Sequence, residues 1–290
     1  MATTTASKGL IALLRLPYWL MTGGLSLLTA FAISSALAEE FPVPTTFVLI
    51  FFSMAFITSA GFALNDYFDR ESDAVIKPKR PIPSGALNLK QVVTVSAVLF
   101  AVGLVLALLI NWLSFVILLV DSVVLVIYSA LVKRWSGFAA NMLVGLLVGT
   151  AFLYGEAAVF GNITLASLSL YPIFLGTVGG NILRDVLSSE GDSRVGYPTL
   201  PQKIGNRGAV SVASIFFVVT AILAPLPYFL GYFGRYYVFL ILSWGIILIY
   251  ASVRLLASSA TAESVKRYER LITMSMLLLI FSLIAEAFAP

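Results

Sequence analysis

Long apolar runs alternate with short polar segments along the whole chain. Nine of these runs reach the roughly 20 residues that a helix needs to cross a bilayer. Two of them meet at Asn111 and Trp112, as expected for a tight turn at a membrane interface. The predicted spans are 17–38, 45–65, 91–110, 112–131, 139–158, 165–184, 209–230, 236–256 and 271–289. The pattern predicts an all-α, multi-span membrane protein with nine transmembrane helices.

The basic residues test this number of spans. With nine spans, the N-terminus and the loops after the second, fourth, sixth and eighth spans share one side of the membrane. Of the 18 Lys and Arg residues, all but Arg235 lie on that side. Cytoplasmic loops carry an excess of Lys and Arg. The distribution therefore predicts an integral protein of the cell (plasma) membrane with a cytoplasmic N-terminus.

Composition narrows the chemistry. Hydrophobic residues make up 60% of the chain and charged residues 11%, and the mean hydropathy is +0.99; soluble domains carry about 25% charged residues. Cysteine and histidine are both absent from the sequence. This excludes disulfides, thiolate nucleophiles, imidazole bases and the usual zinc ligands. The net charge of +4 reflects membrane orientation and gives no indication of nucleic acid binding.

Carboxylates collect where the second span ends. Charge beside hydrocarbon is costly, so such a cluster is a candidate binding site, most often for a cation. If the helix continues, Asn65, Asp66, Asp69 and Asp73 fall within about 100° of one helix face. Carboxylate and amide oxygens are the ligands that Mg²⁺ prefers.

A second polar cluster follows the sixth span. Asn181 and Asp185 repeat the four-residue spacing of the first cluster, and Glu190 and Asp192 follow. Two apolar hairpins that each end in such a face suggest an internal duplication, with a site between the halves. The expected halves are about 1–135 and 136–260.

Both clusters lie on the predicted cytoplasmic side, among most of the basic residues. Mg²⁺ is usually bound through a few carboxylates and the phosphates of a substrate. The expected ligand is therefore a diphosphate or similar group whose tail lies in the membrane. The alternatives are a transporter of an anionic substrate, which would place charge near the bilayer midplane, and a non-catalytic scaffold, which would need no Mg²⁺. Only Asp121 lies at mid-span depth, either facing the cavity or as a neutral, hydrogen-bonded structural acid.

Four motifs carry a resemblance to a known family. They are Asn65-Asp66-x-x-Asp69-x-x-x-Asp73, Lys79-Arg80-Pro81-Ile82-Pro83-Ser84-Gly85, Tyr128 with Lys133-Arg134, and Gly191-Asp192-x-x-Val195-Gly196-x-x-Thr199-Leu200-Pro201. With these motifs the chain resembles the UbiA superfamily of intramembrane prenyltransferases over nearly its whole length. The resemblance implies a single domain, 1–290, with the helices around one central cavity. It also places a cytoplasmic cap over that cavity, for which the polar stretch 66–90 is long enough.

The same resemblance implies a reaction. An isoprenyl group would pass from a polyprenyl diphosphate, such as geranylgeranyl diphosphate, to an acceptor through an allylic carbocation. The acceptor is left open between an aromatic acid such as 4-hydroxybenzoate and a prenylglyceryl phosphate. Two Mg²⁺ ions bridging the diphosphate are the expected cofactors, and the donor, the acceptor and the lipid bilayer are the expected partners.

The resemblance and the residue chemistry together give the candidate site. Metal binding and catalysis are assigned to Asp66, Asp69, Asp73, Asp185 and Asp192. Substrate binding is assigned to Asn65, Arg15, Lys77, Tyr128, Lys133, Arg134, Tyr154, Asn181 and Arg194. The alternative role of the basic residues among them is anchoring at the membrane interface. Where family members usually carry a further Asp, this chain has Ser188, so Glu190 or a water could complete the second metal site.

Overall fold

The computed structural model describes residues 2–37, 43–194, 196–258 and 260–288. Within these ranges every regular element is a helix. Nine helical segments of the described chain are long and apolar enough to cross a membrane, which confirms the nine predicted spans. The last residues of two predicted spans, 38 and 289, lie outside the described residues.

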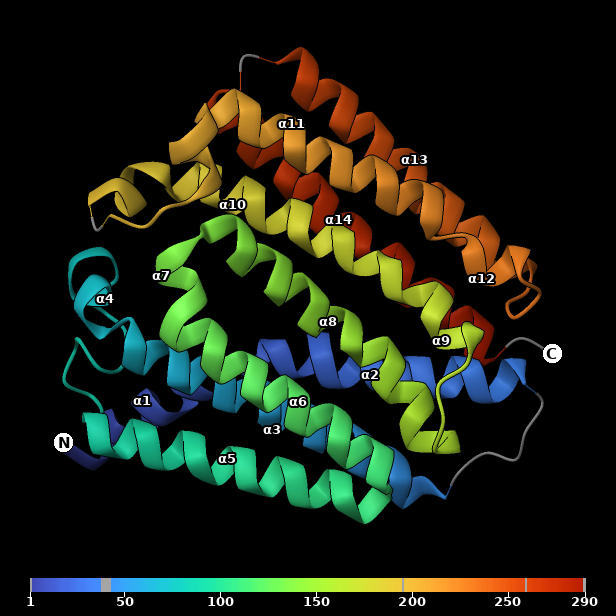
Figure 1. The fold of residues 1–290 in the computed structure, drawn as a ribbon, viewed down its shortest axis with the longest axis horizontal. Coiled ribbons are helices and arrows are strands. Elements are labelled where there is room, and N and C mark those ends of the chain that lie inside the picture. The colour runs from blue at the N-terminus through green and yellow to red at the C-terminus, as the bar shows by residue number, and fades with distance from the viewer. Residues whose placement is uncertain (1, 38–42, 195, 259, 289–290) are drawn as a thin grey trace. The chain divides into compact units, whose positions relative to one another are not determined.

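The helices form two compact units. The first comprises Met1–Leu27 and Pro42–Val132. Its elements are α1 (Ala2–Leu14), the first part of α2 (Pro17–Ala36), α3 (Pro44–Phe68), α4 (Arg70–Ile76), α5 (Leu89–Ile110), α6 (Trp112–Ile127) and the π-helical segment η1 (Tyr128–Val132). Helix α3 is central to this unit, since α1, α5 and α6 all pack against it (Figure 1).

The second unit comprises Leu28–Phe41 and Lys133–Pro290. Its elements are the rest of α2, α7 (Lys133–Trp135), α8 (Gly137–Phe160), α9 (Leu165–Leu170), the 3₁₀ segment η2 (Tyr171–Ile173), α10 (Phe174–Arg194), α11 (Leu200–Leu223), α12 (Leu226–Phe229), α13 (Arg235–Ala257) and α14 (Ala262–Ala287). Helix α10 contacts α8, α11 and α14, and α13 contacts both α11 and α14 (Figure 1).

Several helices extend beyond the apolar runs that predict them. Helix α3 continues to Phe68 and α10 to Arg194, whereas their predicted spans end at 65 and 184. Hydropathy marks only the part of a helix that fits in hydrocarbon, but backbone hydrogen bonding continues through the polar residues that follow. Helix α11 begins at Leu200 and is interrupted at Gly205, whose φ of 74° and ψ of 163° favour glycine. Apart from Asp69, which lies between α3 and α4, the aspartates of both clusters are thus held on helices.

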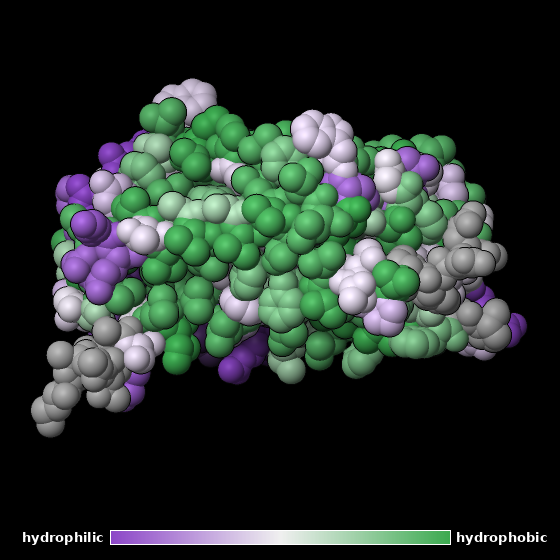
Figure 2. Space-filling model, turned by 90° about the horizontal axis from the view of Figure 1, so that it is seen from below, coloured by the Kyte–Doolittle hydropathy of each residue, from purple (hydrophilic) through white to green (hydrophobic). Residues whose placement is uncertain are grey.

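Apolar side chains cover the exposed surface of the spans. Figure 2 shows one face on which hydrophobic residues form a nearly continuous area, with hydrophilic residues gathered toward its ends. Helix α5 contributes Val98, Val105 and Leu109, which are 53%, 56% and 67% exposed. In water such a surface would mark an aggregation hazard, but against lipid it is the expected exterior. The protein is therefore an integral membrane protein.

One buried carboxylate organises a connection within the second unit. The sequence places Glu156 near the interfacial end of the fifth span, and its side chain is fully buried. It accepts hydrogen bonds from the backbone N–H and hydroxyl of Thr164, at 3.0 Å and 2.5 Å, and from the N–H and hydroxyl of Ser167. Because these donors lie at the start of α9, Glu156 caps that helix from α8.

Candidate active site

The first acidic cluster lies where α3 passes into α4. The N–H of Asp69 donates to the carbonyl of Asn65 at 2.9 Å, and the N–H of Asp73 donates to that of Asp69 at 2.8 Å. The helical path therefore continues through Asp69, the residue between the two helices, and holds the polar side chains at the predicted spacing. The three aspartates Asp66, Asp69 and Asp73 are 3%, 7% and 5% exposed. Buried carboxylates of this kind require partners.

Two arginines are the partners of Asp66 and Asp73. Arg15, between α1 and α2, approaches Oδ1 of Asp66 through Nη2 at 2.5 Å and lies 4.4 Å from the ring centre of Phe62. Nη1 of Arg80 lies 3.0 Å from the same Asp66 oxygen and 2.5 Å from Oδ2 of Asp73. Burial alone would lower the pKa of Arg80, but the carboxylates of Asp66 and Asp73 outweigh it and raise that pKa above its ordinary value. The guanidinium group of Arg80 therefore stays charged.

Asn65 leaves one oxygen in this cluster without a donor. Its amide nitrogen donates to Oδ2 of Asp69 at 2.9 Å. Its Oδ1 is buried and accepts no hydrogen bond from the described residues. A buried acceptor beside three carboxylates fits a cation, which would satisfy it. However, no three Asp or Glu side chains in the described part of the chain are arranged to hold a metal ion.

The second cluster lies on α10 and makes different contacts. Oδ2 of Asp185 accepts a hydrogen bond from the amide of Asn141 on α8 at 2.7 Å. The side chain of Asn181 accepts from Nη1 of Arg184 at 3.2 Å, and Arg184 also pairs with Glu269 on α14 at 3.2 Å. The matching Asn-to-Asp spacing of the two clusters therefore does not produce matching contacts.

Ser188 has a definite role in this arrangement. Its hydroxyl donates to Oδ2 of Asp192 at 2.6 Å. Ser188, where the resemblance leads us to expect an aspartate, thus orients the carboxylate of Asp192 and adds no charge. Glu190 and Arg194 are exposed on the same helix, and Val195 of the motif lies outside the described residues.

The other candidates occupy varied positions. Lys77 is exposed at the end of α4, and Tyr128 opens η1, the kind of π-helical turn that is frequent at functional sites. Lys133 lies 5.2 Å from the ring centre of Tyr197, and Arg134 beside it is exposed.

Tyr154 is fully buried in α8, about 20 Å along that helix from Asn141 by helix geometry. The structure therefore does not bring Tyr154 to the second cluster.

The site assignment from sequence omits two side chains that contact the carboxylates. Arg80 enters it only as part of a motif, although it pairs with two aspartates. Asn141 is not considered, although a polar residue within the fifth apolar span is itself a signal. Asn141 lies 44 residues before Asp185, and Arg80 follows Asp66 and Asp73 by 14 and 7 residues, in the loop after α4. The helical spacing of the aspartates therefore reveals neither partner.

Comparison with known proteins adds independent findings. Residues 26–279 match the UbiA prenyltransferase family. Digeranylgeranylglyceryl phosphate synthase from Natronomonas pharaonis is 40% identical over 233 residues, covering 79% of this chain and 81% of that protein. The protein of the same name from Methanosarcina barkeri is 36% identical over 246 residues, covering 84% of each chain.

Solved structures agree with the family match. One that is described as digeranylgeranylglyceryl phosphate synthase in membranes superimposes with a TM-score of 0.81 at 30% identity, covering 98% of this chain and 99% of the other. A UbiA homologue from Archaeoglobus fulgidus bound to GPP and Mg²⁺ gives a TM-score of 0.69 at 18% identity, covering 95% and 99%. The latter likeness concerns the fold.

Proposed function

Because this chain belongs to the UbiA prenyltransferase family, and is thus a membrane-embedded prenyltransferase, we propose that it joins geranylgeranyl diphosphate to a prenylglyceryl phosphate. Membership in a family of enzymes goes against the two other interpretations of the sequence, a transporter and a non-catalytic scaffold. The reaction is proposed at the cytoplasmic face of the plasma membrane, where the positive-inside rule puts both acidic clusters.

The choice of acceptor is supported by the relatives. The sequence leaves an aromatic acid and a prenylglyceryl phosphate open. The relatives from Natronomonas pharaonis and Methanosarcina barkeri are both named digeranylgeranylglyceryl phosphate synthase, a name that states a prenylglyceryl phosphate product. We therefore favour the prenylglyceryl phosphate, whose hydroxyl oxygen would form the new bond to the prenyl carbon as the diphosphate leaves.

The proposed cofactor is Mg²⁺, with two ions as the resemblance implies. The donor set fits: carboxylates Asp66, Asp69 and Asp73 with the unsatisfied Oδ1 of Asn65 in one unit, and carboxylates Asp185 and Asp192 in the other. The Archaeoglobus fulgidus homologue binds GPP together with Mg²⁺. When bound, the metal would neutralise charge on the leaving diphosphate.

The protein's own groups have separate tasks in this scheme. Arg15 and Arg80 pair with the first carboxylates and would bind phosphate oxygens of the substrate. Tyr67 and Phe68, with ring centres 5.3 Å apart, are candidates to stabilise an allylic cation through their π faces. With no histidine in the chain, the acceptor proton would pass to a carboxylate or to the released diphosphate.

The observation that carries the proposal is a buried group of three aspartates at the end of a membrane helix, two of which pair with arginines. We would test it with purified full-length protein in lipid, labelled geranylgeranyl diphosphate, and geranylgeranylglyceryl phosphate or 4-hydroxybenzoate as acceptor. Product should form only with Mg²⁺ and only with the glyceryl phosphate. Product with 4-hydroxybenzoate alone would overturn the acceptor assignment, and no product with either would overturn the proposed reaction.

A matched pair of variants tests the carboxylate assignment. Asp66→Asn keeps the side-chain shape but removes the charge that faces Arg15 and Arg80, so turnover should fall at least about 100-fold. Glu71→Gln makes the same chemical change on α4 at a side chain that is 87% exposed, and should leave turnover unchanged. Thermal unfolding checks that both variants are folded, and wild-type turnover in Asp66→Asn would refute the assignment.

A further inference from the structure

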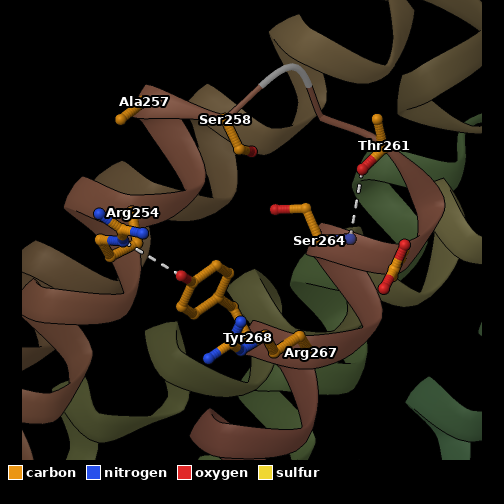
Figure 3. Close-up of a pocket in the computed structure, with 8 residues that line it drawn as sticks. Arg254, Ala257, Ser258, Thr261, Ser264, Arg267 and Tyr268 are labelled. Atoms are coloured by element: carbon orange, nitrogen blue, oxygen red, sulfur yellow. Dashed lines mark hydrogen bonds between the residues drawn. The ribbon is translucent and has the colours of Figure 1, made fainter.

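A polar pocket lies in the second unit, where α13 ends and α14 begins. Its volume is about 340 Å³, and its lining includes Arg254, Ser258, Thr261, Arg267 and Tyr268. Figure 3 shows these side chains around one open space, with Ser264 pointing into it. None of them belongs to the motifs of the acidic clusters, so the proposed reaction does not account for this pocket.

The pocket holds two arginines that have no acidic partner in the described part of the chain. Nε of Arg254 donates to the hydroxyl of Tyr268 at 3.1 Å, and the guanidinium of Arg267 lies 5.9 Å from the centre of the same ring (Figure 3). Within the described residues neither forms an ion pair, although Glu263 also lines the pocket. One tyrosine therefore holds two cationic groups beside the same space. Such an arrangement attracts an anion with several oxygen acceptors.

The start of α14 adds polar groups that also favour an anion. Thr261 caps this 26-residue helix, its hydroxyl oxygen accepting from the N–H of Ser264 at 3.3 Å. The first amides of a helix lack intrahelical acceptors and carry partial positive charge. The hydroxyl of Ser264 points into the pocket and has no hydrogen-bond partner among the described residues. Guanidinium and hydroxyl donors beside the positive end of this helix together suit a phosphate group.

The apolar surroundings of the pocket indicate that such a phosphate would belong to a lipid. Arg254 lies in the last turn of the membrane-spanning α13, between Val253 and Leu256, which are 58% and 47% exposed. An apolar surface for acyl or prenyl chains thus adjoins the cationic pocket at the membrane interface. We propose that this pocket binds the phosphate group of an anionic membrane lipid, separately from the prenyl-transfer site.

Native mass spectrometry of the full-length, delipidated protein in detergent tests this proposal. The probe is phosphatidylglycerol, with phosphatidylcholine and inorganic phosphate as comparisons. The double variant Arg254→Gln/Arg267→Gln should weaken phosphatidylglycerol binding at least about tenfold. Lys266→Gln/Arg270→Gln removes equal charge from exposed positions of α14 outside the pocket, and should bind like the wild type. Glu263→Gln removes the acidic group from the lining and should tighten binding.

The opposing outcomes are distinct. Equal weakening in both double variants would mean general surface attraction and would overturn the site. Displacement of the lipid by low concentrations of inorganic phosphate would show that a free anion is the ligand. Equal binding of phosphatidylcholine would remove the requirement for an anionic lipid. If the double variant unfolds, Arg267→Gln alone serves, since among the described residues that exposed side chain makes only the ring contact. Prenyl transfer should be unchanged in every variant, so failure of the lipid site and failure of the proposed reaction are separable.

Discussion

At the residue scale, the first acidic cluster is stabilised by charge pairing across long stretches of sequence. Burying a carboxylate without a partner costs several kcal/mol. At Asp66 this cost is offset by the guanidinium groups of Arg15, 51 residues before it, and Arg80, 14 residues after it. The identity of the acidic residues could be predicted from their spacing and motif. Their partners could not, because the fold that brings Arg15 and Arg80 to one oxygen is not visible in local sequence.

Arg80 should matter for stability as well as for activity. Arg80→Gln leaves Asp66 with one partner and removes the ion pair of Asp73, whose side chain is 6% exposed. We expect a loss of about 2 kcal/mol in the free energy of unfolding, measured by chemical denaturation in detergent. Lys79→Gln, one residue earlier and exposed, should change it by less than about 0.5 kcal/mol. Equal effects would show that the pairing contributes nothing specific.

At the element scale, glycine allows α8 and α10 to approach each other closely. A Cβ atom at Gly145 would lie 2.4 Å from Cγ2 of Val178, and one at Gly149 would lie 2.9 Å from Cβ of Phe174. Small residues at helix contacts are typical of membrane bundles. This contact also brings Asn141 of α8 to Asp185 of α10. The apolar runs predict that these helices exist, whereas which faces meet depends on three-dimensional packing that hydropathy does not encode.

Two glycine substitutions separate packing from helix propensity. Gly145→Ala inserts a methyl group into the α8–α10 contact and should destabilise the protein by about 1–3 kcal/mol. Gly180→Ala makes the same change on α10 where nothing lies within 4 Å of the new Cβ atom, and should be neutral or stabilising by up to about 1 kcal/mol. Thermal unfolding of both variants in the same detergent is the measurement. A stable Gly145→Ala protein would contradict the close contact.

At the scale of the whole molecule, hydropathy and charge predict most of the architecture. The nine spans are confirmed within the described residues, because a bilayer imposes a length and composition that the sequence must satisfy. The two-fold repeat of 1–135 and 136–260, the central cavity and the cytoplasmic cap remain predictions. They concern relations between distant segments, and neither span length nor the positive-inside rule specifies these.

Membrane orientation can be tested directly because the natural chain contains no cysteine. Asn162→Cys and Gln202→Cys put single thiols at exposed positions, before α9 and at the start of α11. The positive-inside rule predicts that an impermeant maleimide labels the first in intact cells and the second only after permeabilisation. Cysteine-free wild-type protein is the control. The reverse labelling pattern would invert the topology and move the acidic clusters outside the cell.

The pairing of Asp66 and Asp73 with Arg15 and Arg80 has a thermodynamic consequence. The chain supplies its own counter-ions, so the carboxylates are already neutralised before any ligand arrives. A polyanion that pairs with the guanidinium groups removes the counter-ions of the carboxylates. A cation that binds the carboxylates, in turn, frees the guanidinium groups to bind a polyanion. By thermodynamic linkage, bound cation must then raise the affinity for the polyanion by the same factor as bound polyanion raises the affinity for the cation. Cation and polyanion should therefore bind cooperatively, and each weakly when alone.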